Sequence, residues 1–168
     1  MTRLLKAAFT ALLGIGVLVA WTGGPPTSYT FRSTPNEMYV EGGSTLHDWR
    51  CPIQSLSGSL ELDTAGTSAT PIGTVSRVKV RVPVDAIQCD KETMNDKLRN
   101  ALKMNAYPKV HFTLKEAQVS PLPDSGKAWA LVNATGELIL AGERRQIDLP
   151  VKAQRLDNGN LRFVGKHT

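Results

Sequence analysis

VSRVKVRVPV, residues 75–84, alternates valine with a polar, basic or proline residue from Val78 to Val84. Successive side chains of an extended chain point to opposite faces, so this pattern gives one apolar face and one charged face. Such two-sided strands are typical of antiparallel sheets with one face packed on a core and the other in water. The segment therefore predicts a half-buried antiparallel strand.

The same period of two recurs along most of the chain. It is clearest in residues 109–117 (KVHFTLKEA) and 145–153 (RQIDLPVKA). Other candidate strands have the sequences YTFRS (29–33), EMYVEG (37–42), SLSGSLELD (55–63), WALVNATGELILA (129–141) and NLRFVG (160–165). Stretches rich in Gly, Pro, Asn, Asp and Ser separate these segments and predict turns. About eight short strands in 168 residues predict one all-β domain, a barrel or a sandwich.

One segment, residues 90–108, breaks the alternation. Its apolar residues are spaced as one stripe of an α-helix, namely Met94, Leu98, Ala101 and Leu102. Asp90 is suited to cap the first turn, and Pro108 prevents continuation. The segment predicts one amphipathic helix over about residues 91–104.

Residues 1–27 predict an export signal and a linker. Two basic residues precede an apolar run, residues 7–21, which is shorter than the ~20 residues needed to span a bilayer. Cleavage after Ala20 would leave a small residue next to the cut bond, although the rest of the cleavage pattern is weak. An uncleaved membrane anchor is the alternative. In either case residues 28–168 are expected to form the exported domain.

Two cysteines, Cys51 and Cys89, lie in this exported part. An even number in an oxidising compartment predicts a disulfide, with a pair of buried free thiols as the alternative. The closed loop of about 38 residues would stabilise the fold by roughly 4 kcal/mol. The net charge of +5 is modest and dispersed, which argues against a nucleic-acid partner. The basic residues at 77, 79 and 81 are best explained as a solvated face, with contact to anionic lipid head groups as the alternative.

A cluster of polar and aromatic side chains, STLHDWRC at residues 44–51, has the residue types of a catalytic or metal site. His47 and Asp48 are adjacent, so in a strand they would point to opposite faces and not act as a pair. No histidine has the spacing of a metal site, and no metal is expected. Ser44, Thr45 and Asp48 commonly bond local backbone. We therefore expect Ser44, Thr45, His47 and Asp48 to form a structural joint. An enzyme that uses His47 and Asp48 on a small substrate is the alternative.

The order of these features closely resembles the YceI-like family of exported bacterial lipid-binding proteins. The resemblance runs from about Tyr29 to the end of the chain. It rests on STLHDW (44–49), GSLELD (58–63), VPVDAIQC (82–89), MNDKLRNALKMNAYPKVHF (94–112) and ATGELILAGERRQIDLPV (134–151). It implies a lipocalin-like antiparallel β-barrel that holds a polyisoprenoid, such as an isoprenoid quinone, and a periplasmic or secreted location. STLHDW indicates one branch of the family. Compared with the family, we expect the chain to lack a C-terminal strand that closes the barrel.

This resemblance, with which the apolar inward rows agree, implies a non-enzymatic protein that carries or sequesters an amphiphilic isoprenoid-type lipid in an apolar barrel. The residues expected to contact the lipid face inward from the strands, with Trp49 near a mouth: Val78, Val80, Val82, Phe112, Leu114, Leu138 and Ile147. No cofactor beyond such a lipid is expected. A barrel filled by its own side chains, serving as a structural or protein-interaction module, is the alternative. The sequence does not indicate an oligomeric state, and a homodimer is one alternative.

Overall fold

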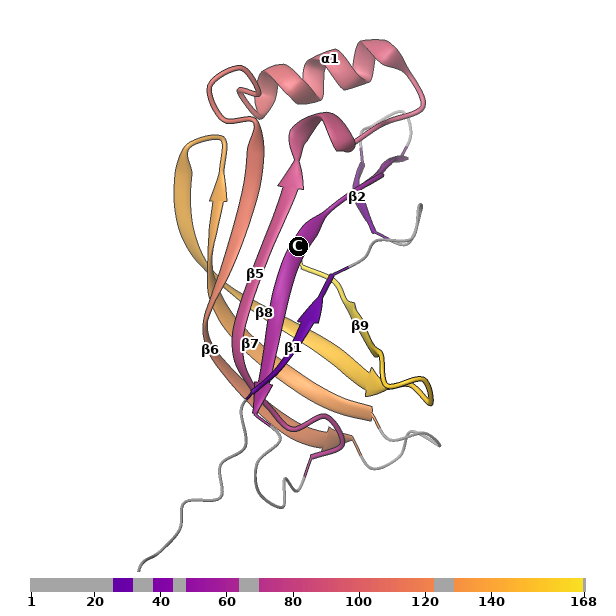
Figure 1. Ribbon diagram of the computed structural model, residues 1–168. Helices are drawn as coiled ribbons and strands as arrows, with labels where there is room; N and C mark the ends of the chain where they lie inside the picture. Colours follow the sequence, from indigo (N-terminus) through magenta and orange to yellow (C-terminus); the bar gives the residue numbers. More distant parts are fainter. Residues whose placement is uncertain (1–25, 32–37, 44–47, 64–69, 123–128, 168) are drawn as a thin grey trace, which may run out of the picture.

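The computed structural model describes residues 26–31, 38–43, 48–63, 70–122 and 129–167 (Figure 1). Within them lie nine strands, a short 3₁₀ helix and one α-helix. The elements are β1 (Thr27–Thr30), β2 (Tyr39–Gly43), β3 (Asp48–Pro52), β4 (Ser57–Asp63), β5 (Thr74–Pro83), η1 (Val84–Ala86), α1 (Glu92–Ala101), β6 (Lys109–Leu122), β7 (Trp129–Leu140), β8 (Glu143–Arg155) and β9 (Leu161–Gly165). The expected all-β fold with one helix is confirmed.

Seven strands form one antiparallel sheet in the order β1-β4-β5-β6-β7-β8-β9, and β2 pairs with β3 in a separate ribbon. The large sheet curls into a half-barrel, and α1 lies across one end of it (Figure 1). Within the described residues, β1 and β9 are the two edges of the sheet and do not pair with each other. Because β1 begins at Thr27, this residue belongs to the sheet, although it was expected in the lead-in segment.

The inner face of the sheet carries the alternating apolar residues. In β6 the register shifts between Leu114 and Glu116, which marks a β-bulge. Before the bulge the inward residues have even numbers, and beyond it Ala117 and Val119 pack against the core. Because one extra residue reverses the alternation, the bulge keeps both halves of this long strand apolar on the inside.

The lower half of the half-barrel, away from α1, is filled by a cluster that we call the lower core. Its buried members are Leu60, Leu62, Ile72, Val75, Ala130, Val132, Ala134 and Ala153. Aromatic rings from both edges of the sheet pack on it, since Phe31 follows β1 and Phe163 lies on β9, with ring centroids 6.4 Å apart. Arg155 of β8 donates a hydrogen bond to the Tyr29 hydroxyl at 2.9 Å. Side chains thus link the two edges where no backbone ladder does.

The other end holds a second cluster beneath α1, the upper core, whose buried members are Cys51, Ile53, Val82, Ile87 and Cys89. Met94, Leu98 and Leu102 of the predicted helical stripe pack on it, whereas Ala101 is exposed. The expected Cys51–Cys89 disulfide is formed. Together with a bridge between Ile53 and Ile87, it fastens β3 to the segment before the helix.

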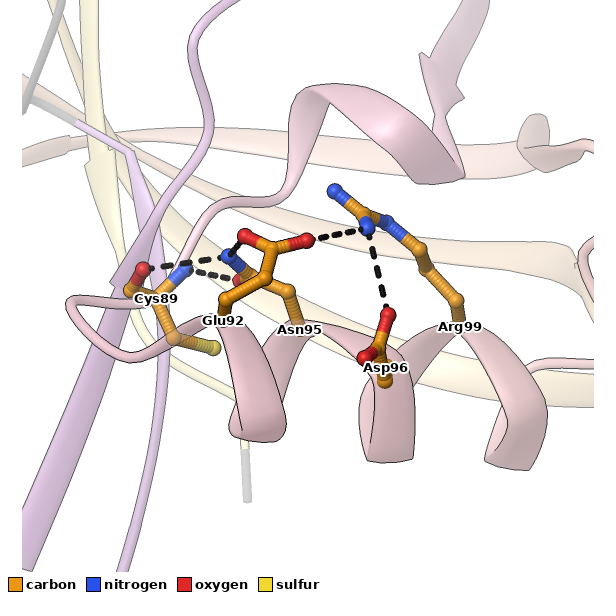
Figure 2. Close-up of polar contacts among 5 residues, drawn as sticks. All are labelled: Cys89, Glu92, Asn95, Asp96 and Arg99. Atoms are coloured by element: carbon orange, nitrogen blue, oxygen red, sulfur yellow. Dashed lines mark hydrogen bonds and ion pairs between the residues drawn. The ribbon is translucent and has the colours of Figure 1, made fainter.

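The start of α1 differs from expectation. The helix spans Glu92–Ala101, shorter than 91–104, and Lys91 rather than Asp90 is its N-cap, with no side-chain capping bond. Asn95, inside the helix, holds the segment that precedes it, because its Oδ1 accepts a hydrogen bond from the Cys89 N–H at 2.6 Å (Figure 2). Its Nδ2 donates to Glu92 at 2.9 Å, and this bond, with Arg99, lowers the pKa of Glu92 below its usual range.

Candidate functional site

Apart from Trp49, the residues predicted to contact a lipid come from four neighbouring strands, β5 to β8. The register pairs Val80 with Phe112 and Phe112 with Leu138. In the next row, Gly136 pairs with both Leu114 and Ile147. Because directly opposed residues of an antiparallel pair share a face, these side chains form one contiguous apolar surface on the inside of the curl.

Burial divides the predicted residues into two groups. Val82 is only 6% exposed and belongs to the upper core. The other strand residues in the set are half-buried: Val78, Val80, Phe112, Leu114, Leu138 and Ile147. Three of them, Phe112, Leu138 and Ile147, belong to neither core cluster. We call these six half-buried residues the inner apolar face. The protein's own side chains leave part of this face uncovered.

Gly136 shapes the middle of the inner apolar face. A Cβ at this position would lie 2.4 Å from Cζ of Phe112 and 2.7 Å from the Thr113 carbonyl oxygen. The phenyl ring therefore lies against the glycine backbone of the neighbouring strand. Sequence reasoning missed this contact, which depends on the cross-strand register.

Trp49 lies apart from this face. It is half-buried on β3 and packs against the upper core. Its indole covers Gly42 of β2, where a Cβ would come within 2.3 Å of Cζ2. The side chain is thus held against its own ribbon and contributes to the wall beneath the helix.

The ribbon is also linked to the far edge of the sheet. Glu41 of β2 forms ion pairs with Lys166, just beyond β9, at 2.5 Å and with Arg50 of β3 at 3.4 Å. The hydrogen bond and charge of Lys166, followed by those of Arg50, hold the pKa of Glu41 below its usual range. The same contact raises the pKa of Lys166. The ribbon is therefore fastened by a disulfide at one end and by an ion pair to the C-terminal edge.

The chemical candidates of the 44–51 segment are only partly described. Ser44, Thr45 and His47 lie outside the described residues. Asp48 is exposed and pairs with Gly43. In the described part of the chain, no group of three His, Cys, Asp or Glu residues is placed to hold a metal ion.

Charged residues of β8 border the inner apolar face, and one of them, Glu143, opposes Leu140 on the inner side. Arg145 of β8 is exposed and directly opposes Leu138, so it shares the inner side of the sheet. The described residues offer it no ion-pair partner within 4.0 Å. The candidate strand 145–153 already contained Arg145, and the structure extends this strand back to Glu143. The turn before β8 is Ala141–Gly142.

The model of the YceI-like domain matches residues 29–167. The chain belongs to the YceI-like family. Among solved structures, a polyisoprenoid-binding domain from Saccharophagus degradans has 18% identity and a TM-score of 0.49, over 77% of this chain and 64% of that one. The YceI protein of Campylobacter jejuni has 16% identity and a TM-score of 0.50, over 76% of this chain and 68% of that one. The structural likeness to the Campylobacter jejuni protein shows a shared fold. No curated protein matches the sequence.

Family membership supports a binding protein, since YceI-like proteins are not known as enzymes. The disulfide fits an exported protein, because such bonds persist in oxidising compartments. The predicted export signal falls almost wholly on residues 1–25, outside the described residues. In the described ranges no helix is long and apolar enough to cross a membrane.

Proposed function

We propose that this protein is an exported, non-enzymatic binding protein of the bacterial periplasm. It carries or sequesters an amphiphilic isoprenoid-type lipid on the inner apolar face of the half-barrel. Val78, Val80, Phe112, Leu114, Leu138 and Ile147 contact the lipid tail, and Val82 and Trp49 form the wall beneath α1.

The observation that carries this proposal is the incomplete burial of the inner apolar face. Phe112, Leu138 and Ile147 face inward from adjacent strands, yet they pack into neither core cluster. Covering such surface with a lipid tail gains roughly 25 cal/mol for each Å² of apolar area removed from water. A surface of Val, Leu, Ile and Phe offers no hydrogen bonds, so it suits a slender hydrocarbon and selects it by width and length.

The amphiphilic character of the ligand is supported by what borders this surface. Arg145 shares the inner side of the sheet and directly opposes Leu138. A lipid whose tail covers Leu138 and Ile147 would bring its polar head close to this exposed guanidinium. The isoprenoid class of the tail rests on the family to which the chain belongs.

A protein-interaction module is the second candidate, and the lower core favours it. There the half-barrel is filled by its own side chains, with Ala130 and Ala153 completely buried and Phe31 packed near Phe163. If a similar collapse covered the inner apolar face in solution, the protein would hold no lipid.

Native mass spectrometry of the full chain, expressed with export to the periplasm, tests the proposal. The expected result is a stoichiometric adduct that organic extraction identifies as an isoprenoid. A folded protein that carries no lipid, and acquires none when incubated with an isoprenoid quinone, would refute the carrier function and favour the interaction module.

A further inference from the structure

Two connections meet at the end of the half-barrel that α1 covers (Figure 1). One is the segment between α1 and β6, and the other is the β7–β8 hairpin. Tyr107 of the first lies against Gly142 of the second, where a Cβ would be 2.5 Å from Cζ of the tyrosine ring. Ala141 and Gly142 have φ values of 52° and 86°, as the two central residues of a tight hairpin turn require. A glycine here gives both the turn and room for the ring.

This paired structure exposes apolar side chains. Tyr107 is 44% exposed and Leu140 is 36% exposed. Leu140 shares the inner side of β7 with Leu138, two residues away, so its surface continues the inner apolar face. The exposed apolar residues are therefore continuous with the face on which we propose that the lipid lies.

The same segments are basic. Residues 103–109 and 137–145, which we call the tip, contain four cations, Lys103, Lys109, Arg144 and Arg145, against the carboxylates Glu137 and Glu143. Glu137 is paired with Arg144, whose side chain remains 71% exposed. Four cations less two carboxylates give the tip a formal charge of +2, and it carries an exposed tyrosine and leucine.

We infer that the tip docks the protein on an anionic bilayer surface. Tyrosine is favoured at membrane interfaces because its ring is apolar and its hydroxyl remains in the head-group layer. Each Lys or Arg near an anionic leaflet raises the constant for partition of the protein onto the membrane about fivefold. Docked in this way, Leu140 would lie between the bilayer and the inner apolar face. The inference concerns the surface alone and stands or falls without a bound lipid.

Hydrogen exchange of the full chain, followed by mass spectrometry of its peptides, tests the inference. The vesicles are phosphatidylcholine with or without phosphatidylglycerol. We expect slower exchange in residues 103–109 and 137–145 with the anionic vesicles and no change with the neutral ones. This readout reports on the tip itself, whatever the predicted export signal does on the same vesicles. Unchanged exchange in both segments would overturn the inference and would favour a protein as the partner of this surface.

Charge variants give the matched control. Lys103→Gln with Lys109→Gln should raise, roughly 30-fold, the concentration of anionic lipid at which half of the protection of the tip is reached. The factor follows from the loss of two basic residues, each of which contributes about fivefold. Lys115→Gln with Lys152→Gln removes two exposed lysines from strands outside the tip and should change it much less. Equal effects of the two pairs would show attraction by net charge alone and would also overturn the inference. Lipid extraction tests the proposed carrier function separately, so the two failures are distinguishable.

Discussion

Leu138 and Ile139 are neighbours on β7 and allow a paired test of the inner apolar face. Both side chains are half-buried, but they point to opposite sides of the sheet. Leu138 opposes Phe112 on the inside, whereas Ile139 opposes His111 on the outside. Leu138→Gln should therefore weaken lipid binding strongly, and Ile139→Gln should leave it nearly unchanged.

The expected loss follows from burial. A fully buried leucine is worth roughly 1.5–3 kcal/mol, and Leu138 is partly covered without ligand, so covering the remainder contributes about 1 kcal/mol. Burying an amide under a hydrocarbon tail without a partner costs roughly 1–3 kcal/mol more. The sum of about 2–4 kcal/mol corresponds to a Kd raised roughly 30- to 1,000-fold.

The assay is quenching of tryptophan fluorescence by a long-chain isoprenoid quinone added to delipidated protein. Circular dichroism and a thermal melt establish that both variants are folded. Equal affinities of the Leu138 and Ile139 variants would refute the placement of the ligand on the inner face, as would a loss confined to the Ile139 variant.

Three further predictions concern the framework around the inner apolar face. Replacing Cys51 and Cys89 together by serine should lower the unfolding free energy by about 4 kcal/mol, and Tm by roughly 10–15 °C, because the disulfide closes a loop of 38 residues; a calorimetric loss below ~1 kcal/mol would contradict this. Asn95→Ala should cost about 1–3 kcal/mol in chemical denaturation, since it leaves the buried Cys89 N–H without its acceptor, and a neutral effect would show that water replaces the amide. Glu41→Gln should lower the unfolding free energy of the protein at neutral pH. The difference in stability between the variant and the wild type should vanish as the pH falls below the ordinary pKa of 4.5 and through the lowered pKa of Glu41, because protonation of Glu41 ends its pairing with Lys166. Urea midpoints across this pH range measure it, and a difference that persists in acid would disprove the assignment.

Local sequence patterns predicted much of the fold. The alternation of residues 75–84 predicted β5 and its inward face, because a strand with one side in water and one on a core needs that polarity. The stripe of Met94, Leu98 and Leu102 predicted a helix that packs on the sheet, and these three side chains do pack on the upper core. These features depend on a few neighbouring residues and one boundary between core and solvent.

Features set by pairing between distant segments were not predictable in this way. The contact between the Phe112 ring and the backbone of Gly136 depends on the register between β6 and β7. Asp90 was expected to cap α1, but Lys91 is the N-cap, and the bond from the buried Cys89 N–H to Asn95 depends on how the segment before the helix packs. The strand prediction for residues 145–153 included Arg145, but its place opposite Leu138 on the inner side depends on the register between β7 and β8.

The most direct measurement of the central claim is photocrosslinking with a diazirine-bearing polyisoprenoid, followed by mass-spectrometric mapping of the labelled residues. The account predicts labels on the inner side of β5 to β8, concentrated at Phe112, Leu138 and Ile147, and competed by unlabelled isoprenoid. Labels confined to the outer side of the sheet, or labelling that the competitor does not reduce, would contradict it.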